Sequence, residues 1–375
     1  MKETELSVIL PCRNEEEALA SCINQIKTVL KINGLRGEII VSDSSTDDSP
    51  NIAKKLGAIL VKHDKFGYGN AYLEAFKIAK GKYIFMADAD GSYDFEEIPR
   101  FLEELKKGND LVIGNRLNNL EEGSMPFMHK YLGNPILSIM MKIFFKTKIN
   151  DSQCGMRAIK RSILERLNLR TTGMEFASEM IIKAIKSNLK LKELSITYKK
   201  RLGKSKLRSF SDGWRHLRFM LSYSPLFLFF IPGLSLFILG VISLIAFSFT
   251  NPRILGTNFF IHPMFVSSLI TIMGYQIIFF GIFSRTYSYV HLNDKNSFLD
   301  KIYSKITLEK IILIGLLIAS VGLFIFIYIL LKWIDSSFGQ LNEIKSSLLA
   351  LTLIVIGIQT IFSSFMLSII GIKNN

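Results

Sequence analysis

Two aspartates that follow a short apolar run have the clearest chemical potential in this sequence. Asp88 and Asp90 come directly after the strand-like run 83–86, YIFM. Because side chains alternate along an extended chain, carboxylates two residues apart point to the same side. Carboxylate oxygens are the ligands that hard divalent cations prefer, so the pair could hold Mg²⁺ or Mn²⁺. A cation there would neutralise a diphosphate and stabilise it as it leaves a sugar carbon.

Candidate site residues also follow three other strand-like runs, where each run ends. They are Pro11, Arg13, Asn14 and Glu15 after 6–10, Asp43 to Asp47 after 38–41, and Asn115 and Arg116 after 111–113. Ligands of open α/β sheets bind beyond the carboxyl ends of the strands, so these residues should share one rim. Ser45, Thr46 and Asp47 could equally be turn residues and helix caps.

The elements that must position these residues alternate over the first 115 residues. Strands are expected at 6–10, 38–41, 58–61, 83–86 and 111–113, with amphipathic helices at 15–30, 50–56, 70–79 and 96–106. This alternation predicts a mostly parallel sheet with right-handed crossovers and helices on both faces. The N-terminal part should therefore be an α/β domain.

Four long apolar segments follow this domain. They lie at 221–249, 259–282, 311–331 and 346–370. A hydrocarbon core of about 30 Å takes about 20 helical residues to cross, and the segments are apolar on all faces, which disfavours core helices of a soluble domain. Because no Asp, Glu, Lys or Arg lies deep inside them, they lack the pattern of an ion-coupled transporter. We predict a soluble domain at 1–220 and a helical transmembrane domain of four spans at 221–375.

The connectors between the spans differ in charge. Arg253 is alone between the first two spans, whereas the next connector carries Arg285, Lys295, Lys301, Lys305 and Lys310. Lys and Arg favour cytoplasmic loops, so this basic connector should be cytoplasmic. An even number of spans and an N-terminus without an apolar signal then predict an integral membrane protein whose N-terminal domain is cytoplasmic.

The overall composition agrees with a chain that is part soluble and part membrane. Of 375 residues 49% are hydrophobic, the mean hydropathy is +0.29 and the net charge is +14. The densest basic stretch, 199–218, ends where the first apolar segment begins, which favours anionic lipid headgroups over nucleic acid as its partner. Three cysteines without metal-ligand spacing predict reduced thiols.

The order of the motifs resembles glycosyltransferase family 2, with its GT-A fold. The motifs are PCRNEE at 11–16, DSSTD at 43–47, DAD at 88–90, GNR at 114–116, DSQCGMR at 151–157 and RLGKSKL at 201–207. Within that family they are similar to the dolichol-phosphate (polyprenyl-phosphate) mannose or glucose synthases. The resemblance covers roughly residues 5 to 220.

The resemblance implies a role for each motif. The nucleoside pocket would include Pro11, Arg13, Glu15 and Asp43, with Asp43 bonding the base. Asp88 and Asp90 would hold the donor and its Mg²⁺ or Mn²⁺, and together with Arg116 they would form the catalytic group. The residues implied in binding the acceptor phosphate are Arg116, Lys130, Arg201, Ser205 and Lys206, and the first three could bind the donor diphosphate instead.

Three residues depart from the family pattern. Ser42 stands where many members carry a second Asp, Ser92 where many carry a Gln, and Lys204 where Glu is frequent.

A lipid phosphate is already anionic, so its attack on a sugar needs positioning more than a strong base. No histidine lies in the motifs, and we expect His63, His129 and His216 at the surface or the membrane interface. Glu175 and Glu179 could be an acid pair, position basic side chains, or cap a helix.

These features predict inverting transfer of a hexose from UDP-glucose or GDP-mannose to a polyprenyl or dolichyl phosphate. A processive polysaccharide synthase is an alternative, but its Gln-x-x-Arg-Trp motif is missing, since Trp214-Arg215 has the reverse order and no such Gln. The other alternative is a membrane bundle with a nucleotide-sensing domain and no catalysis. The expected partners are the nucleotide-sugar, the lipid phosphate and the membrane, without nucleic acid, and a homo-oligomer stays open.

Overall fold

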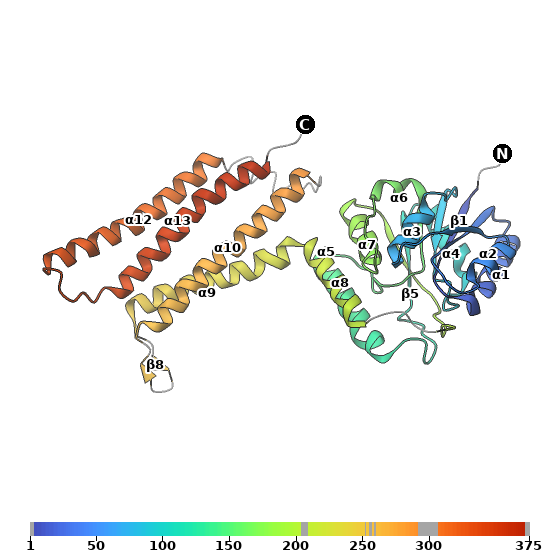
Figure 1. Cartoon of the computed structure of the whole chain (residues 1–375), viewed down its shortest axis with the longest axis horizontal. Coiled ribbons are helices and arrows are strands. Elements are labelled where there is room, and N and C mark those ends of the chain that lie inside the picture. The colour runs from blue at the N-terminus through green and yellow to red at the C-terminus, as the bar shows by residue number, and fades with distance from the viewer. Residues whose placement is uncertain are drawn as a thin grey trace. The chain divides into compact units, whose positions relative to one another are not determined.

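The chain folds into two compact units. Figure 1 shows the computed structural model, which describes residues 4–203, 209–251, 253–254, 257–258, 260–291 and 307–371. The units are Met1–Tyr223 and Ser224–Asn375.

The first unit is built on a seven-stranded sheet. Its strands are β1 (Leu6–Cys12), β2 (Gly37–Asp43), β3 (Ile59–Lys62), β4 (Tyr83–Met86), β5 (Leu111–Asn115), β6 (Arg157–Lys160) and β7 (Leu191–Ser195). They lie in the order β3-β2-β1-β4-β6-β5-β7, and β6 runs antiparallel to both neighbours while the other pairs are parallel. Six strands therefore end at the same edge. The predicted α/β fold, with a mostly parallel sheet, and its first five strands are confirmed.

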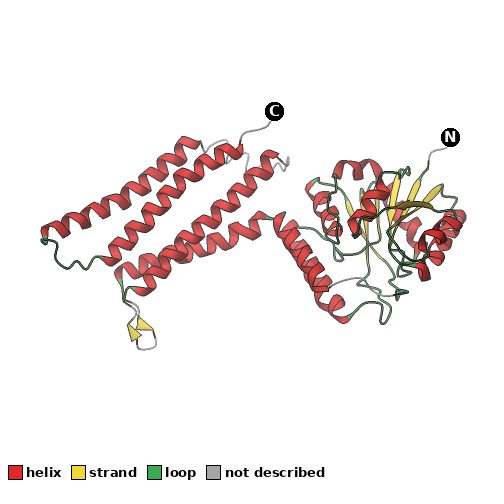
Figure 2. Cartoon of the chain, viewed as in Figure 1, coloured by secondary structure: helices red, strands yellow, loops and turns green. Residues whose placement is uncertain are grey.

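Helices pack on both sides of the strands (Figure 2). The helices of this unit are α1 (Glu16–Ile32), α2 (Ser49–Lys55), α3 (Tyr68–Phe76), α4 (Ile98–Lys106), α5 (Asn134–Phe145), α6 (Arg161–Leu167), α7 (Phe176–Lys186) and α8 (Ser209–Ser222). Two short turns, η1 (Phe95–Glu97) and η2 (His129–Gly133), precede α4 and α5. Because helices cover both faces of the sheet, β4 is buried along its whole length, as the continuous apolar run predicted.

The second unit consists of long apolar helices. They are α9 (Ile231–Phe249), which continues the turn η3 (Leu226–Phe230), α10 (His262–His291), α12 (Leu308–Asp335) and α13 (Ile344–Gly371), and two short strands, β8 (Arg253–Ile254) and β9 (Thr257–Asn258), precede α10. Four segments of 24 to 29 residues are long and apolar enough to cross a membrane. The four predicted spans are confirmed, and most are longer than the sequence suggested.

Glycines let these helices approach closely. A Cβ on Gly274 of α10 would lie 2.3 Å from the backbone nitrogen of Phe237 in α9, and one on Gly357 would lie 2.5 Å from that of Ala319. Such small residues are the usual contacts between membrane helices, where lipid competes with apolar side chains. A hydrogen bond of 2.6 Å between Ser268 and Thr352 also joins α10 to α13.

All three cysteines are buried thiols without a disulfide. Burial raises the pKa of Cys12, Cys22 and Cys154 to about 12, so little thiolate forms at neutral pH. We expect iodoacetamide at pH 8 to leave the folded chain unmodified and to modify all three thiols after denaturation. Intact-mass analysis of both samples measures this, and one equivalent of label on the native chain would contradict it.

Candidate active site

The carboxylate pair lies at the end of β4, near the middle of the sheet. Asp90 is 6% exposed, and its Oδ1 accepts hydrogen bonds from the Ser92 N–H at 3.0 Å and the Ser92 hydroxyl at 2.5 Å. Asp88 is half-buried, and its Oδ1 accepts no hydrogen bond from the described residues. Ser92 thus fixes Asp90, while Asp88 has a buried oxygen to which no described residue donates a hydrogen bond.

The surroundings of Asp88 disfavour a negative charge on it. Burial raises the pKa of Asp88 well above its usual range, the charge of Asp90 adds to the rise, and Arg116 opposes it. A Cβ on Gly155 would lie 3.0 Å from Asp88 Oδ2 and 2.8 Å from the hydroxyl of Tyr68. The 151–157 loop therefore lies directly against this carboxylate, and Gly155 is the residue that permits the approach.

Arg201 joins two of the motifs. Its guanidinium lies 3.3 Å from Glu15 Oε1 and 3.6 Å from Asp90 Oδ2. The following N–H, of Leu202, donates to the carbonyl of Asp90 at 2.9 Å. The segment after β7 thus crosses the carboxylate loop, and it brings Glu15, Asp90 and Arg201 together.

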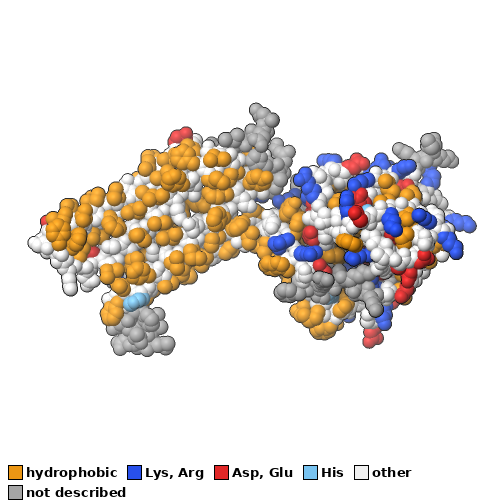
Figure 3. Space-filling view, viewed as in Figure 1, with side chains coloured by type: hydrophobic (Ala, Val, Ile, Leu, Met, Phe, Trp, Pro, Cys, Tyr) orange, Lys and Arg blue, Asp and Glu red, His pale blue; other side chains and the backbone are white. Residues whose placement is uncertain are grey.

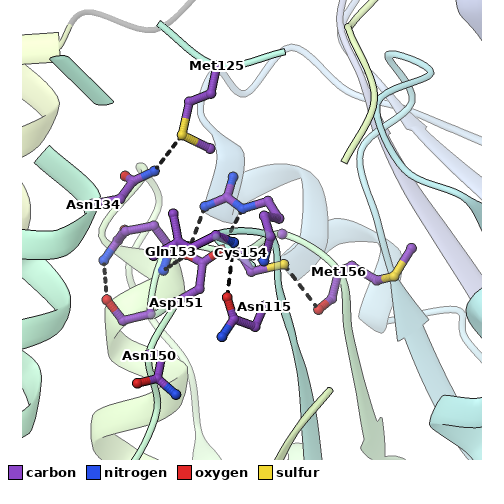
Figure 4. Close-up of polar contacts among 12 residues, drawn as sticks. Asn115, Met125, Asn134, Asn150, Asp151, Gln153, Cys154 and Met156 are labelled. Atoms are coloured by element: carbon purple, nitrogen blue, oxygen red, sulfur yellow. Dashed lines mark hydrogen bonds and ion pairs between the residues drawn. The ribbon is translucent and has the colours of Figure 1, made fainter. Parts of the chain in front are cut away.

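Arg116 is engaged by a carboxylate of the 151–157 loop. Its Nε and Nη2 donate to Asp151 Oδ2 and Oδ1 at 2.7 and 2.9 Å, and its backbone N–H donates to Oδ2 at 3.1 Å. Arg116 is 8% exposed and Asp151 is fully buried, and Figure 4 shows Asp151 beside Gln153 and Asn115. This bidentate pair neutralises Arg116 and fixes the loop.

A second buried arginine closes the same loop. Arg157 is 1% exposed, and its guanidinium donates to the carbonyls of Ser152 at 3.0 Å, Cys154 at 2.8 Å and Ala177 at 2.7 Å. Sequence reasoning assigned no role to Arg157 or Asp151. The only signal was that both residues belong to the 151–157 motif.

The nucleoside-pocket candidates lie along β1 and β2. In the register of these strands Pro11 pairs with Ser42 and Cys12 with Asp43. Asp43 is fully buried, and neither of its carboxylate oxygens accepts a hydrogen bond from the described residues. Arg13 is exposed and stacks on Phe66, with 4.6 Å between the guanidinium carbon and the ring centre.

The loops after β1 and β2 are joined by short polar side chains. Asn14 has a φ of 54°, and its Oδ1 accepts the N–H of Thr46 at 2.8 Å. Ser45 Oγ accepts the N–H of Asn14, and Asp47 Oδ2 accepts the N–H of Glu16. Ser45, Thr46 and Asp47 therefore act as turn and capping residues, one of the two alternatives that the sequence left open.

Comparison with known proteins identifies the family of this chain. Residues 7–167 match the model of Glycosyl transferase family 2, and residues 282–371 match the Glycosyltransferase family 2 C-terminal transmembrane region. The chain is 39% identical over 368 residues to the low-salt glycan biosynthesis hexosyltransferase Agl6 of Haloferax volcanii, covering 98% of this chain and 89% of that protein. The chain belongs to glycosyltransferase family 2.

Two further proteins are similar to this glycosyltransferase. A dolichyl-phosphate hexose transferase of Haloferax volcanii is 30% identical over 210 residues, covering 56% of this chain and 89% of that protein. Glucosyl-3-phosphoglycerate synthase of Mycobacterium tuberculosis in complex with phosphoglyceric acid is 18% identical, with a TM-score of 0.48, covering 59% and 80% of the two chains. With its family 2 transmembrane region and four apolar helices, the glycosyltransferase is an integral membrane protein.

The expectation of surface histidines was wrong for His216. This residue of α8 is 4% exposed, its Nδ1 lies 2.9 Å from the hydroxyl of Ser178, and burial lowers its pKa to about 4. The helical period turns His216 toward α7 while Trp214 and Arg218 stay exposed. His63 is half-buried, and its Nε2 lies 3.1 Å from the hydroxyl of Ser42.

Lys130, Ser205 and Lys206 are the remaining predicted site residues of the glycosyltransferase. Lys130 is in η2, where its ammonium lies 5.2 Å from the ring centre of Tyr131, and Ser205 and Lys206 lie outside the described residues. Glu179 is buried, accepts the N–H groups of residues 170 and 171, and forms an ion pair with Lys183 at 2.7 Å. Glu179 therefore holds the loop at residues 170 and 171 in place.

Proposed function

We propose that the enzyme transfers a hexose from a nucleotide-sugar to a polyprenyl or dolichyl phosphate, with inversion at the anomeric carbon. The observation that supports this most is the pair Asp88 and Asp90 at the end of a central strand, beside the cation of Arg201, in a chain that also spans a membrane. Similarity to a dolichyl-phosphate hexose transferase agrees with a lipid acceptor.

The buried carboxylate of Asp43 favours a nucleoside as the part of the donor that the protein binds. An unpaired carboxylate in a protein interior is costly, so a ligand that donates N–H groups to it gains affinity. Uracil presents one ring N–H to such a group, and guanine presents a ring N–H and an amino group. UDP-glucose and GDP-mannose are the donors we propose, with Pro11, Arg13 and Glu15 beside them.

The carboxylate pair fits Mg²⁺ or Mn²⁺. Asp88 Oδ1 is a buried oxygen to which none of the described residues donates, and Asp90 Oδ2 already faces a cation, the guanidinium of Arg201. Within the described residues no three His, Cys, Asp or Glu side chains gather as a metal site. Mg²⁺ commonly takes one or two carboxylates and completes its shell with substrate phosphates. Such an ion would neutralise the departing diphosphate.

Because the acceptor phosphate already carries a negative charge, the protein mainly has to position it. A phosphate monoester is an anion and can attack without losing a proton to a base, so the enzyme must hold it in line with the bond that breaks. We assign this task to Arg201, with Lys130, Ser205 and Lys206 as further contacts. We also propose that residues 1–220 form the catalytic domain and face the cytoplasm, because the basic connector after the second span favours that side.

A donor screen with the purified full chain tests the function. We expect UDP-glucose or GDP-mannose, but not both equally, to give a lipid product one hexose heavier than undecaprenyl or dolichyl phosphate by mass spectrometry. EDTA should abolish the product, and added Mg²⁺ or Mn²⁺ should restore it. A ladder of longer products would favour a processive synthase, and no product with any donor would favour the non-catalytic bundle.

A further inference from the structure

One side of the helix α10 is exposed along most of its length. The opposite side packs against α9 and α13, where Gly274 lies close to Phe237 and Ser268 bonds with Thr352. Exposed residues recur on α10 at steps of three and four in the series Val266, Leu269, Met273, Gln276 and Phe280, and Tyr287 follows seven residues later. Such heptad steps place side chains in one row, as at the contact of two parallel helices. We call these six residues the α10 row.

Gln276 brings an amide to the centre of the span. The segment that is long and apolar enough to cross a membrane runs from His262 to Val290, so Gln276 lies 14 residues from either end. At 1.5 Å per residue this is about 21 Å, which exceeds half the thickness of a hydrocarbon core of about 30 Å. On the face that Figure 3 shows, hydrophobic side chains cover most of this unit. The exposed amide of Gln276 therefore lies in the apolar part of a bilayer.

Other polar side chains in this part of α10 have hydrogen-bond partners inside the unit. Ser268 lies 2.6 Å from the hydroxyl of Thr352, and Tyr275, the residue before Gln276, bonds with the hydroxyl of Thr360. No hydrogen bond among the residues that the structure describes includes the side chain of Gln276. The bundle thus provides partners for the hydroxyl groups at this depth, while the amide of Gln276 points out of it.

An amide in hydrocarbon is costly unless it is hydrogen-bonded, and acyl chains offer it no donor or acceptor. Membrane helices meet this need through polar side chains of an adjacent helix. Copies of one chain insert into a membrane in one orientation, so a two-fold axis between two α10 helices sets Gln276 beside its equivalent at the same depth. A carboxamide both donates and accepts, so it can pair with its own copy. A second copy of this chain is therefore the partner that fits.

We propose that two copies associate along the α10 row, with the amides of Gln276 bonded to each other at its centre. Met273 and Phe280, one turn to either side, would then pack against the same residues of the second copy. The helix α12 provides the contrast within the same unit. Its side chains Leu317 and Phe324 are 65% and 72% exposed and need only acyl chains around them.

Disulfide cross-linking of the full-length chain in the membranes of the expressing cells tests this, because all copies there share one orientation. Met273→Cys and Phe280→Cys report on the α10 row. Leu317→Cys is the matched control, since it is exposed and also lies near the middle of its span. The three native thiols are buried, and the unsubstituted chain gives their background. Copper phenanthroline oxidises the thiols, and non-reducing gels measure the dimer.

We expect a disulfide-linked dimer at positions 273 and 280, and little at position 317. Adding Gln276→Leu to Met273→Cys should lower the amount of dimer by about three-fold or more, because a hydrogen bond between membrane helices is lost. Gln276→Asn keeps the amide and should retain most of the dimer. As little dimer at 273 and 280 as at 317 would overturn the proposal. An unchanged dimer with Gln276→Leu would overturn it as well, because the amide would then not hold the copies together.

Discussion

We expect the replacement of Asp90 by Asn to lower hexose transfer by roughly 100-fold or more, because it removes one preorganised charge at the reacting centre. The substitution keeps the size of the side chain and an oxygen that can accept the bonds from Ser92. It removes the negative charge that faces Arg201 and that would share the divalent ion with Asp88. Initial rates with the donor found in the screen, over a range of Mn²⁺ concentrations, measure the effect.

Asp94→Asn is the matched control. Asp94 lies four residues further along the same loop, and its carboxylate accepts hydrogen bonds from Gln25, Glu96 N–H and Lys199. The charge change is the same, but Asp94 is outside the proposed site, so transfer should fall only slightly. Full activity of Asp90→Asn, or equal losses in both variants, would remove the carboxylate pair from the mechanism.

The first half of the sheet could be predicted from local pattern alone. β1, β2 and β4 are buried apolar runs, and each is followed by turn residues and an amphipathic helix. β6 and β7 could not be read this way. β6 has only four residues, with a basic residue at each end, and β7, with the sequence LKELS, has no strict alternation and no buried residue. Their place in the sheet depends on pairing with distant strands, which periodicity does not encode.

The candidate site, like the sheet, could be predicted only in part from local sequence. Asp43, Asp88 and Asn115 all lie at strand ends, so a parallel sheet puts them on one edge. The partner of Arg116 lies 35 residues away and the contact of Arg201 with Glu15 spans 186 residues, so neither follows from spacing. The resemblance supplied the motifs, but it could not show that the carboxylate of Asp151 already forms an ion pair with the guanidinium of Arg116.

The length of an apolar segment predicts a membrane span, but it does not predict the surroundings of a shorter apolar helix. Spans of 24 residues or more were visible in the sequence because they exceed the thickness of the bilayer. α5 has only 12 residues, so its apolar character predicts a core helix equally well. Only the structure shows that Ile136, Ile139 and Ile143 are about half exposed and do not lie in the core.

Removing the carboxylate of Asp151 should strongly destabilise the catalytic unit. Asp151→Ala leaves the guanidinium of Arg116 buried without its partner, and it also removes the acceptor for the Gln153 N–H. Breaking a buried ion pair from one side costs roughly 3–5 kcal/mol. The temperature at which Cys154 becomes open to iodoacetamide measures the loss, because Cys154 is buried in the same loop.

Glu103→Ala is the control for this variant, since its pair with Lys107 is exposed and should contribute little. A midpoint for Asp151→Ala no lower than that of Glu103→Ala would show that Asp151 does not neutralise Arg116. Arg116 would then be a cation available to a phosphate, as the motif first implied. A large fall instead makes Arg116 a positioning residue that holds the 151–157 loop against Asp88, and it leaves Arg201 as the cation at the carboxylate pair.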